Sequence, residues 1–127
     1  MYRILAVEDD TIMQKTLRDI IRPEGFEFFL SPTGKEGIDA ALKDKPDLIL
    51  LDIHLPDMNG MDVCRAIKTD ARTKHIPVVM LTGQAWEVNQ RVQGLECGAE
   101  DYLLKPISPR VLVSRIRAIL RAATKPT

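Results

Sequence analysis

The sequence carries no excess of charge of either sign. Its 18 Lys and Arg residues balance 18 Asp and Glu residues, so the formal net charge is zero at pH 7. Binding to nucleic acid or to an anionic membrane surface draws on a broad positive field, which a neutral chain does not supply. We therefore expect no direct nucleic-acid binding by this segment and no association with a membrane.

Long hydrophobic runs are also absent. The longest, such as those at residues 48–51 and 78–81, are far shorter than the roughly 20 apolar residues of a membrane-spanning helix. No positively charged stretch followed by an apolar one opens the chain, as it would in a secretory signal. With 127 residues, the chain has the size of one compact domain. The sequence predicts a single cytoplasmic domain.

Cysteine is scarce. Cys64 and Cys97 are the only two, and neither has a second cysteine or a pair of histidines at the spacing of a zinc site. A disulfide framework or a zinc centre is therefore a poor interpretation. The sequence predicts two reduced, half-buried thiols.

The chain does contain a regular alternation of short apolar runs and segments of helical periodicity. Runs at 48–51 and 78–81 are apolar without alternation, as in parallel strands covered by helices on both faces. Strands separated by helical crossovers give a doubly wound, three-layer α/β sandwich with a parallel sheet. The predicted strands are residues 2–7, 26–31, 48–51, 78–81 and 102–104.

Capping residues mark where the predicted helices begin. Asp10 precedes the first helix, Thr33 and Glu36 form a capping-box pattern before the second, and Ser108 precedes the last. Residues 85–95 carry an apolar stripe that predicts a fourth helix, although its internal glycine costs about 1 kcal/mol relative to alanine. The sequence thus predicts five strand–helix units.

Reactive side chains follow four of the five predicted strands. In open parallel sheets, ligands bind beyond the carboxyl ends of the strands, so residues at these ends gather at one rim. The residues that leave the strands are Glu8 with Asp9, Ser31 with Pro32, Asp52, Thr82 with Gly83, and Lys105 with Pro106.

Three of these residues, Glu8, Asp9 and Asp52, are acids. Carboxylates crowded at one rim raise one another's pKa unless a cation joins them. An all-oxygen ligand set suits Mg²⁺, whereas zinc prefers nitrogen and sulfur. The sequence therefore predicts a magnesium site.

The remaining rim residues suit a phosphate group. Lys105 adds a positive charge for a phosphoryl oxygen, and Thr82 supplies a hydroxyl. Gly83 leaves open space and a backbone N–H for an incoming group. Together with the acids, these residues predict a site that binds a phosphate dianion beside a metal ion.

Read in order, these motifs resemble the receiver domains of two-component response regulators (CheY-like). The matching stretches are the first strand with its acidic pair, Asp52, the loop at 55–60, the Thr82–Gly83 pair and the stretch 102–106. Each motif alone is weak, but their order and spacing are specific, and the likeness covers nearly the whole chain. The resemblance implies a flavodoxin-like (βα)5 fold with strand order 2-1-3-4-5.

The resemblance also implies roles for individual residues. Asp52 is the phosphoacceptor that takes a phosphoryl group from a histidine kinase or a histidine phosphotransfer protein. Asp9 and Asp52 are direct Mg²⁺ ligands, Glu8 acts largely through water, and the backbone carbonyl of His54 completes the shell. Glu8 stands where the family more often has Asp, a change that a water-mediated ligand tolerates.

Further implied roles concern switching. Lys105 and Thr82 bind the phosphoryl group, and Tyr102 moves as Thr82 turns inward. This repacks the face made by the fourth helix, the fifth strand and the fifth helix, which contacts a downstream effector or output domain. The domain is thus a switch that catalyses only its own phosphorylation and dephosphorylation. The family also implies a cis bond between Lys105 and Pro106, which X-Pro bonds tolerate.

Two positions bear on the lifetime of the phosphorylated state. His54 and Gln84 lie two residues beyond Asp52 and Thr82, where their side chains could align or screen the hydrolytic water. We predict that changing His54 or Gln84 alters dephosphorylation more than phosphorylation.

Two other interpretations stay open. A haloacid-dehalogenase-like hydrolase also uses a strand-end Asp and Mg²⁺, but that family expects a DxD pair, a cap and a longer chain. A receiver-like interaction module that no longer depends on phosphorylation would show a broken acidic cluster or a missing Lys or Thr, and none is missing here. We expect residues 1–122 to form the receiver domain and residues 123–127 a short tail or the start of a linker.

Overall fold

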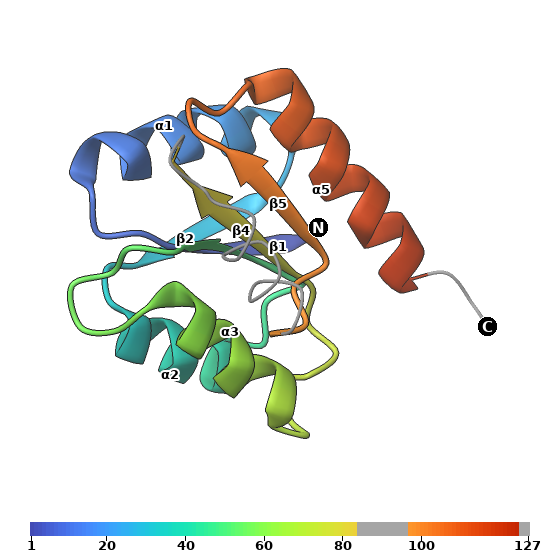
Figure 1. Cartoon of the computed structure of the whole chain (residues 1–127). Helices are drawn as coiled ribbons and strands as arrows, with labels where there is room; N and C mark the ends of the chain where they lie inside the picture. Colours follow the sequence, from blue (N-terminus) through green and yellow to red (C-terminus); the bar gives the residue numbers. More distant parts are fainter. Residues whose placement is uncertain (84–96, 125–127) are drawn as a thin grey trace.

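The computed structural model describes residues 1–83 and 97–124 (Figure 1). Its five strands form one parallel sheet in the order β2-β1-β3-β4-β5, which confirms the predicted order. Each strand lies within one residue of its predicted bounds. The elements are β1 (Arg3–Val7), α1 (Thr11–Ile21), the 3-10 turn η1 (Arg22–Glu24), β2 (Glu27–Ser31), α2 (Gly34–Asp44), β3 (Leu48–Asp52), α3 (Gly60–Thr69), β4 (Val78–Thr82), β5 (Asp101–Leu104) and α5 (Pro109–Thr124).

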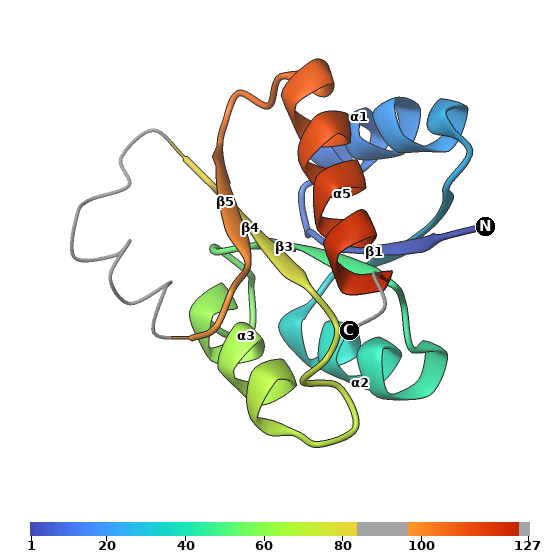
Figure 2. The same ribbon diagram turned by 90° about the vertical axis from the view of Figure 1, so that its right-hand side faces the viewer.

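The described helices cover both faces of the sheet. Figures 1 and 2 show α1 and α5 on one side, with α2 and α3 on the other. Each face has its own apolar core, one beneath α1 and α5 and one beneath α2 and α3. Every residue of β3 and β4 is buried, as their unalternating apolar sequences predict.

Side-chain caps begin the first helices where the sequence predicts them. The carboxylate of Asp10 accepts from the amide of Met13 at 2.9 Å, and the hydroxyl of Thr33 accepts from the amide of Glu36 at 3.1 Å. These bonds satisfy amides that a helix leaves without partners in its first turn. Gly25 follows η1 with a φ of +89°, a conformation that favours glycine. The chain thereby turns into β2.

The structure corrects one expectation and leaves another outside its scope. Cys64 and Cys97 form no disulfide and are 0% and 3% exposed, so the expectation of half-buried thiols was wrong. Their sequence neighbours do not reveal this, because the burial comes from packing of α3 against the turn before β5.

The predicted fourth helix at 85–95 lies outside the described residues. Within residues 1–83 and 97–124, no helix is long and apolar enough to cross a membrane.

Candidate functional site

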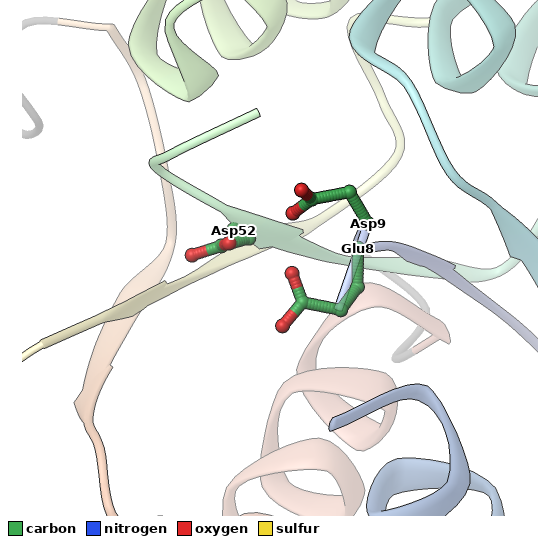
Figure 3. Close-up of side chains that lie close together, drawn as sticks. All are labelled: Glu8, Asp9 and Asp52. Carbon is green, nitrogen blue, oxygen red and sulfur yellow. The ribbon is translucent and has the colours of Figure 1, made fainter. Parts of the chain in front are cut away.

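Three carboxylates meet at the carboxyl ends of β1 and β3. Glu8 and Asp9 follow the last residue of β1, and Asp52 is the last residue of β3. The two strands are parallel neighbours with Val7 opposite Leu51, so the three acids emerge side by side. One ligand oxygen from each lies within 4.8 Å of the others, and Figure 3 shows the three side chains gathered there. The predicted convergence of the acids is confirmed.

Burial and a shortage of positive charge shape this acidic cluster. Glu8 is 0% and Asp52 5% exposed, whereas Asp9 is exposed. Lys105 lies 3.1 Å from Oδ1 of Asp52 and 3.3 Å from Oε1 of Glu8. Among residues 1–83 and 97–124, one ammonium group therefore lies beside three carboxylates, which leaves an excess of negative charge.

Glu8 shows the effect of this excess most clearly. Burial, followed by a hydrogen bond to Asp52 and repulsion from it, raises the pKa of Glu8 to about 8, although Lys105 opposes the change. The second oxygen of Glu8, Oε2, is buried and has no hydrogen-bond partner in the described part of the chain. An unpartnered buried oxygen is costly, so this atom is suited to a ligand that the protein alone does not supply.

The donor set fits a hard divalent cation. Glu8, Asp9 and Asp52 offer only oxygen atoms, and Asp9 faces solvent, from which further ligands can come. A cation among them would offset the excess charge and partner the orphaned oxygen of Glu8. These residues could therefore hold Mg²⁺.

Lys105 reaches the cluster from the end of β5. Its backbone amide donates to the carbonyl of Thr82 at 2.6 Å, which ties the residue to the end of β4. Burial alone would lower the pKa of Lys105, but the charges and hydrogen bonds of Asp52 and Glu8 outweigh it and raise this pKa. The ammonium group thus stays charged beside Asp52. The Lys105–Pro106 bond is cis, as predicted.

Thr82 and Gly83 complete the rim. Thr82 ends β4, is 2% exposed, and its hydroxyl donates to the carbonyl of Gly83 over a long 3.5 Å. A Cβ added at Gly83 would have no described atom within 4 Å, so space is open there. Tyr102 lies half-buried on β5 opposite Met80 of β4 and packs against the core beneath α2 and α3.

The structure does not test the predicted roles of His54 and Gln84. His54 is exposed and forms an isolated antiparallel bridge with Asn59. The use of its carbonyl as a metal ligand stays a prediction, as does the effect of its side chain on dephosphorylation. Gln84 lies outside the described residues.

Sequence reasoning missed two residues that fix the loop after Asp52. A Cβ at Gly60 would overlap the carbonyl oxygen of Asp52 and lie 2.7 Å from Cα of Ile53, so the start of α3 packs directly on the end of β3. Asp57 accepts from the amides of Gly34 and Lys35 at 2.8 and 3.0 Å, which holds the pKa of Asp57 below its usual value. The sequence places both residues in the loop at 55–60, but no local pattern in that loop indicates which atoms they contact.

Comparison with known proteins gives a consistent set of relatives. The family model of the response regulator receiver domain matches residues 4–117. The DNA-binding response regulator MtrA of Mycobacterium tuberculosis is 44% identical over 119 residues, which cover 94% of this chain and 50% of MtrA. The transcriptional regulatory protein CpxR of Escherichia coli K12 is 44% identical over 121 residues, 95% of this chain and 50% of CpxR. The chain thus spans about half the length of these curated relatives.

A solved structure agrees in fold. The crystal structure of a putative response regulator from Chloroflexus aurantiacus matches with a TM-score of 0.89 and 34% identity, and the match covers 94% of this chain and 97% of that one. These likenesses favour the first of the three sequence interpretations over a dehalogenase-like hydrolase. Because its strand order, its acids at the rim and a family match over most of its length all agree, the chain belongs to the receiver domains of two-component response regulators.

Proposed function

We propose that Asp52 accepts a phosphoryl group in a Mg²⁺-dependent reaction and that the resulting aspartyl phosphate switches the conformation of the domain. The donor is a phosphohistidine on a histidine kinase or a histidine phosphotransfer protein. The observation that carries the proposal is the position of Asp52, at the end of a central strand between two further acids and Lys105.

The chemistry follows from the positions of these side chains. A carboxylate oxygen of Asp52 attacks the phosphorus in line, the nitrogen–phosphorus bond of the donor breaks, and its electron pair stays on the imidazole nitrogen. Because phosphoryl transfer depends mainly on positioning and charge, the ammonium of Lys105, held 3.1 Å from Asp52, offsets negative charge on the transferred group.

Glu8, Asp9 and Asp52 would hold the metal ion, together with the backbone carbonyl of His54. The bound cation would supply further offset of the charge on the phosphoryl oxygens. Glu8 contributes a buried oxygen without a partner in the described chain, which supports its use as a ligand, whether direct or through water.

Switching would begin at Thr82. Among the described residues, its hydroxyl makes a single contact, at 3.5 Å, so little is lost when it turns toward the phosphoryl group beside Gly83. Tyr102, half-buried on the neighbouring strand, would then repack. The face of predicted helix 85–95, β5 and α5 would present the change to an effector or output domain.

The names of the relatives suggest the kind of output. MtrA is a DNA-binding response regulator and CpxR a transcriptional regulatory protein, and in each the match covers about half the chain. We propose that this segment acts in the cytoplasm as the receiver unit of a regulator, with no direct contact to nucleic acid. In this proposal the receiver domain ends near residue 122, and residues 123–127 form a short tail or the start of a linker.

Intact mass after incubation with acetyl phosphate and Mg²⁺ tests the proposal. We expect a gain of one phosphate, about 80 Da, on wild type and none on Asp52→Asn. Asp62→Asn is the matched control, because Asp62 is exposed on α3 and pairs only with nearby Arg65 among described residues. Phosphate retained by Asp52→Asn, or absent from wild type, would contradict the assignment of Asp52.

A further inference from the structure

Two thiols that lie far apart in the sequence touch in the fold. The sulfur of Cys64, on α3, lies 3.5 Å from the carbonyl oxygen of Cys97, and its S–H also reaches the sulfur of Cys97. Cys97 opens the turn that leads into β5, so the contact joins α3 to that turn. Both residues are buried in the core beneath α2 and α3.

Polar contacts fix this turn against α3. Lys68 of α3 donates to the carboxylate of Glu100 and to the carbonyl of Ile76, both at 2.7 Å. The other oxygen of Glu100 accepts from the amide of Val78 at 2.8 Å. Gly98 has a φ of +91°, and a Cβ there would lie 3.2 Å from Cγ of Lys68. The two sulfurs are therefore held as neighbours by the structure around them.

The environments of the two thiols differ. The sulfur of Cys97 accepts hydrogen bonds from Cys64 and from the amide of Ala99, and the positive charge of Arg65 lies nearby. These contacts outweigh burial and lower the pKa of Cys97. The hydrogen bond to Cys97 and burial raise the pKa of Cys64. A thiol that ionises readily beside one that stays protonated is the arrangement of an attacking and a resolving cysteine.

We propose that Cys64 and Cys97 form an oxidisable dithiol that closes to an intramolecular disulfide when the protein meets hydrogen peroxide. The thiolate of Cys97 attacks the peroxide, the O–O bond breaks, and Cys97 becomes a sulfenic acid as hydroxide leaves. The sulfur of Cys64 then attacks the sulfur of Cys97, and water leaves with the proton of Cys64. In sum, two thiols and one peroxide give one disulfide and two waters.

The disulfide would clamp the turn before β5 to α3. The proposal uses neither Asp52 nor Lys105, so it stands independently of phosphorylation.

Intact mass and thiol alkylation of the wild-type chain test the proposal. After treatment with hydrogen peroxide, we expect a loss of about 2 Da, no alkylation of either cysteine in denaturant, and full reversal by dithiothreitol. Because the chain has only two cysteines, one cross-linked peptide identifies the bond. A reference dithiol in the same tube shows that the peroxide dose is sufficient. If both cysteines can still be alkylated after the reference is oxidised, the proposal is overturned. Covalent dimers instead of the intramolecular disulfide would overturn it as well.

Single variants test the order of attack. Alanine suits these small buried positions better than serine, because it adds no polar group. In Cys64→Ala we expect dimedone to trap a sulfenic acid at Cys97 that forms more slowly than in wild type, because the hydrogen bond from Cys64 that favours the thiolate is lost. In Cys97→Ala we expect Cys64 to stay reduced. Faster oxidation of Cys64 than of Cys97 would overturn the assignment of Cys97 as the attacking thiol.

Discussion

At the scale of single residues, the site is built around a deficit of positive charge. Lys105 contacts both Asp52 and Glu8, and Asp9 adds a third carboxylate. Without a further cation, part of this charge is relieved by the raised pKa of Glu8. A buried group kept in an unfavourable state is typical of functional sites, because the protein accepts a stability cost there for the sake of binding.

Lys105→Met tests the part of the ammonium group in transfer. We expect the rate of phosphorylation by acetyl phosphate to fall about 100-fold or more, because a positioned charge at the transferred group is lost. The stability loss should stay below the roughly 3–5 kcal/mol of a broken buried pair, since Glu8 can take up a proton instead. The phosphorylation rate is measured by intact mass over time, and the free energy of unfolding by urea titration. Lys15→Met, at an exposed position, is the control. An unchanged rate would contradict the role given to Lys105.

At the scale of elements, the position of Asp52 depends on how α3 meets β3. The amide of Gly60 donates to the carbonyl of Ile53 at 2.7 Å, and the absence of a side chain at Gly60 permits this approach. Asp57, in the same loop, bonds the first amides of α2. The loop after β3 is therefore fixed at both ends by helices.

Gly60→Ala should damage stability and function together. The added Cβ would meet the backbone of Asp52 and Ile53, and overpacking of this kind costs about 1–3 kcal/mol. A displaced Asp52 should also lose about 100-fold in phosphorylation rate, the typical effect of a misplacement near 1 Å. Gly83→Ala, where a Cβ has open space, is the control for stability. Equal urea midpoints for the two variants would count against the close approach.

Asp57→Asn should show a stability difference that depends on pH. The folded-state pKa of Asp57 lies below the 3.8 of a free aspartate, so its charge stabilises the fold above about pH 4, and this contribution is lost as the pH falls through the folded-state pKa. Asn keeps an acceptor but not the charge. We expect the variant to melt below wild type at pH 7 and the gap to narrow as the pH falls below 3.8. A gap of the same size at pH 7 and at the lowest pH at which both proteins stay folded would argue against the charge effect.

These elements also show how far sequence reasoning reaches. The apolar runs predict parallel strands, and the carboxyl ends of parallel strands lie side by side. The residues that follow these runs, among them Glu8, Asp9, Asp52 and Lys105, are therefore expected to meet. The contacts of Asp57 and Gly60, and the pairing of the two thiols, join elements whose relative placement no local pattern encodes. They depend on the distance between packed helices, which appears only in three dimensions.

At the scale of the whole molecule, metal binding should act on global stability. A ligand that binds only the folded state adds about 1.4 kcal/mol at ten times its Kd, which raises the melting temperature of a domain of this size by about 5 °C. We expect Mg²⁺ to raise the melting temperature of wild type by this amount. Glu8→Gln should melt higher than wild type without the metal and gain less from it, because a neutral side chain replaces a buried acid. Calorimetry with and without Mg²⁺ measures both effects, and an equal gain in both proteins would remove Glu8 from the ligand set.

The course of α5 has a practical consequence. Leu120 and Ala123, near its end, line a hollow with residues at the beginnings of β1, β3 and β4, on the edge of the sheet opposite the acids. A fluorescent dye placed at Ala123 would thus be separated from an incoming phosphoryl donor by the length of the strands, because the two lie at opposite ends of the strands. Any change in its emission upon phosphorylation would report a signal relayed through the protein rather than direct quenching.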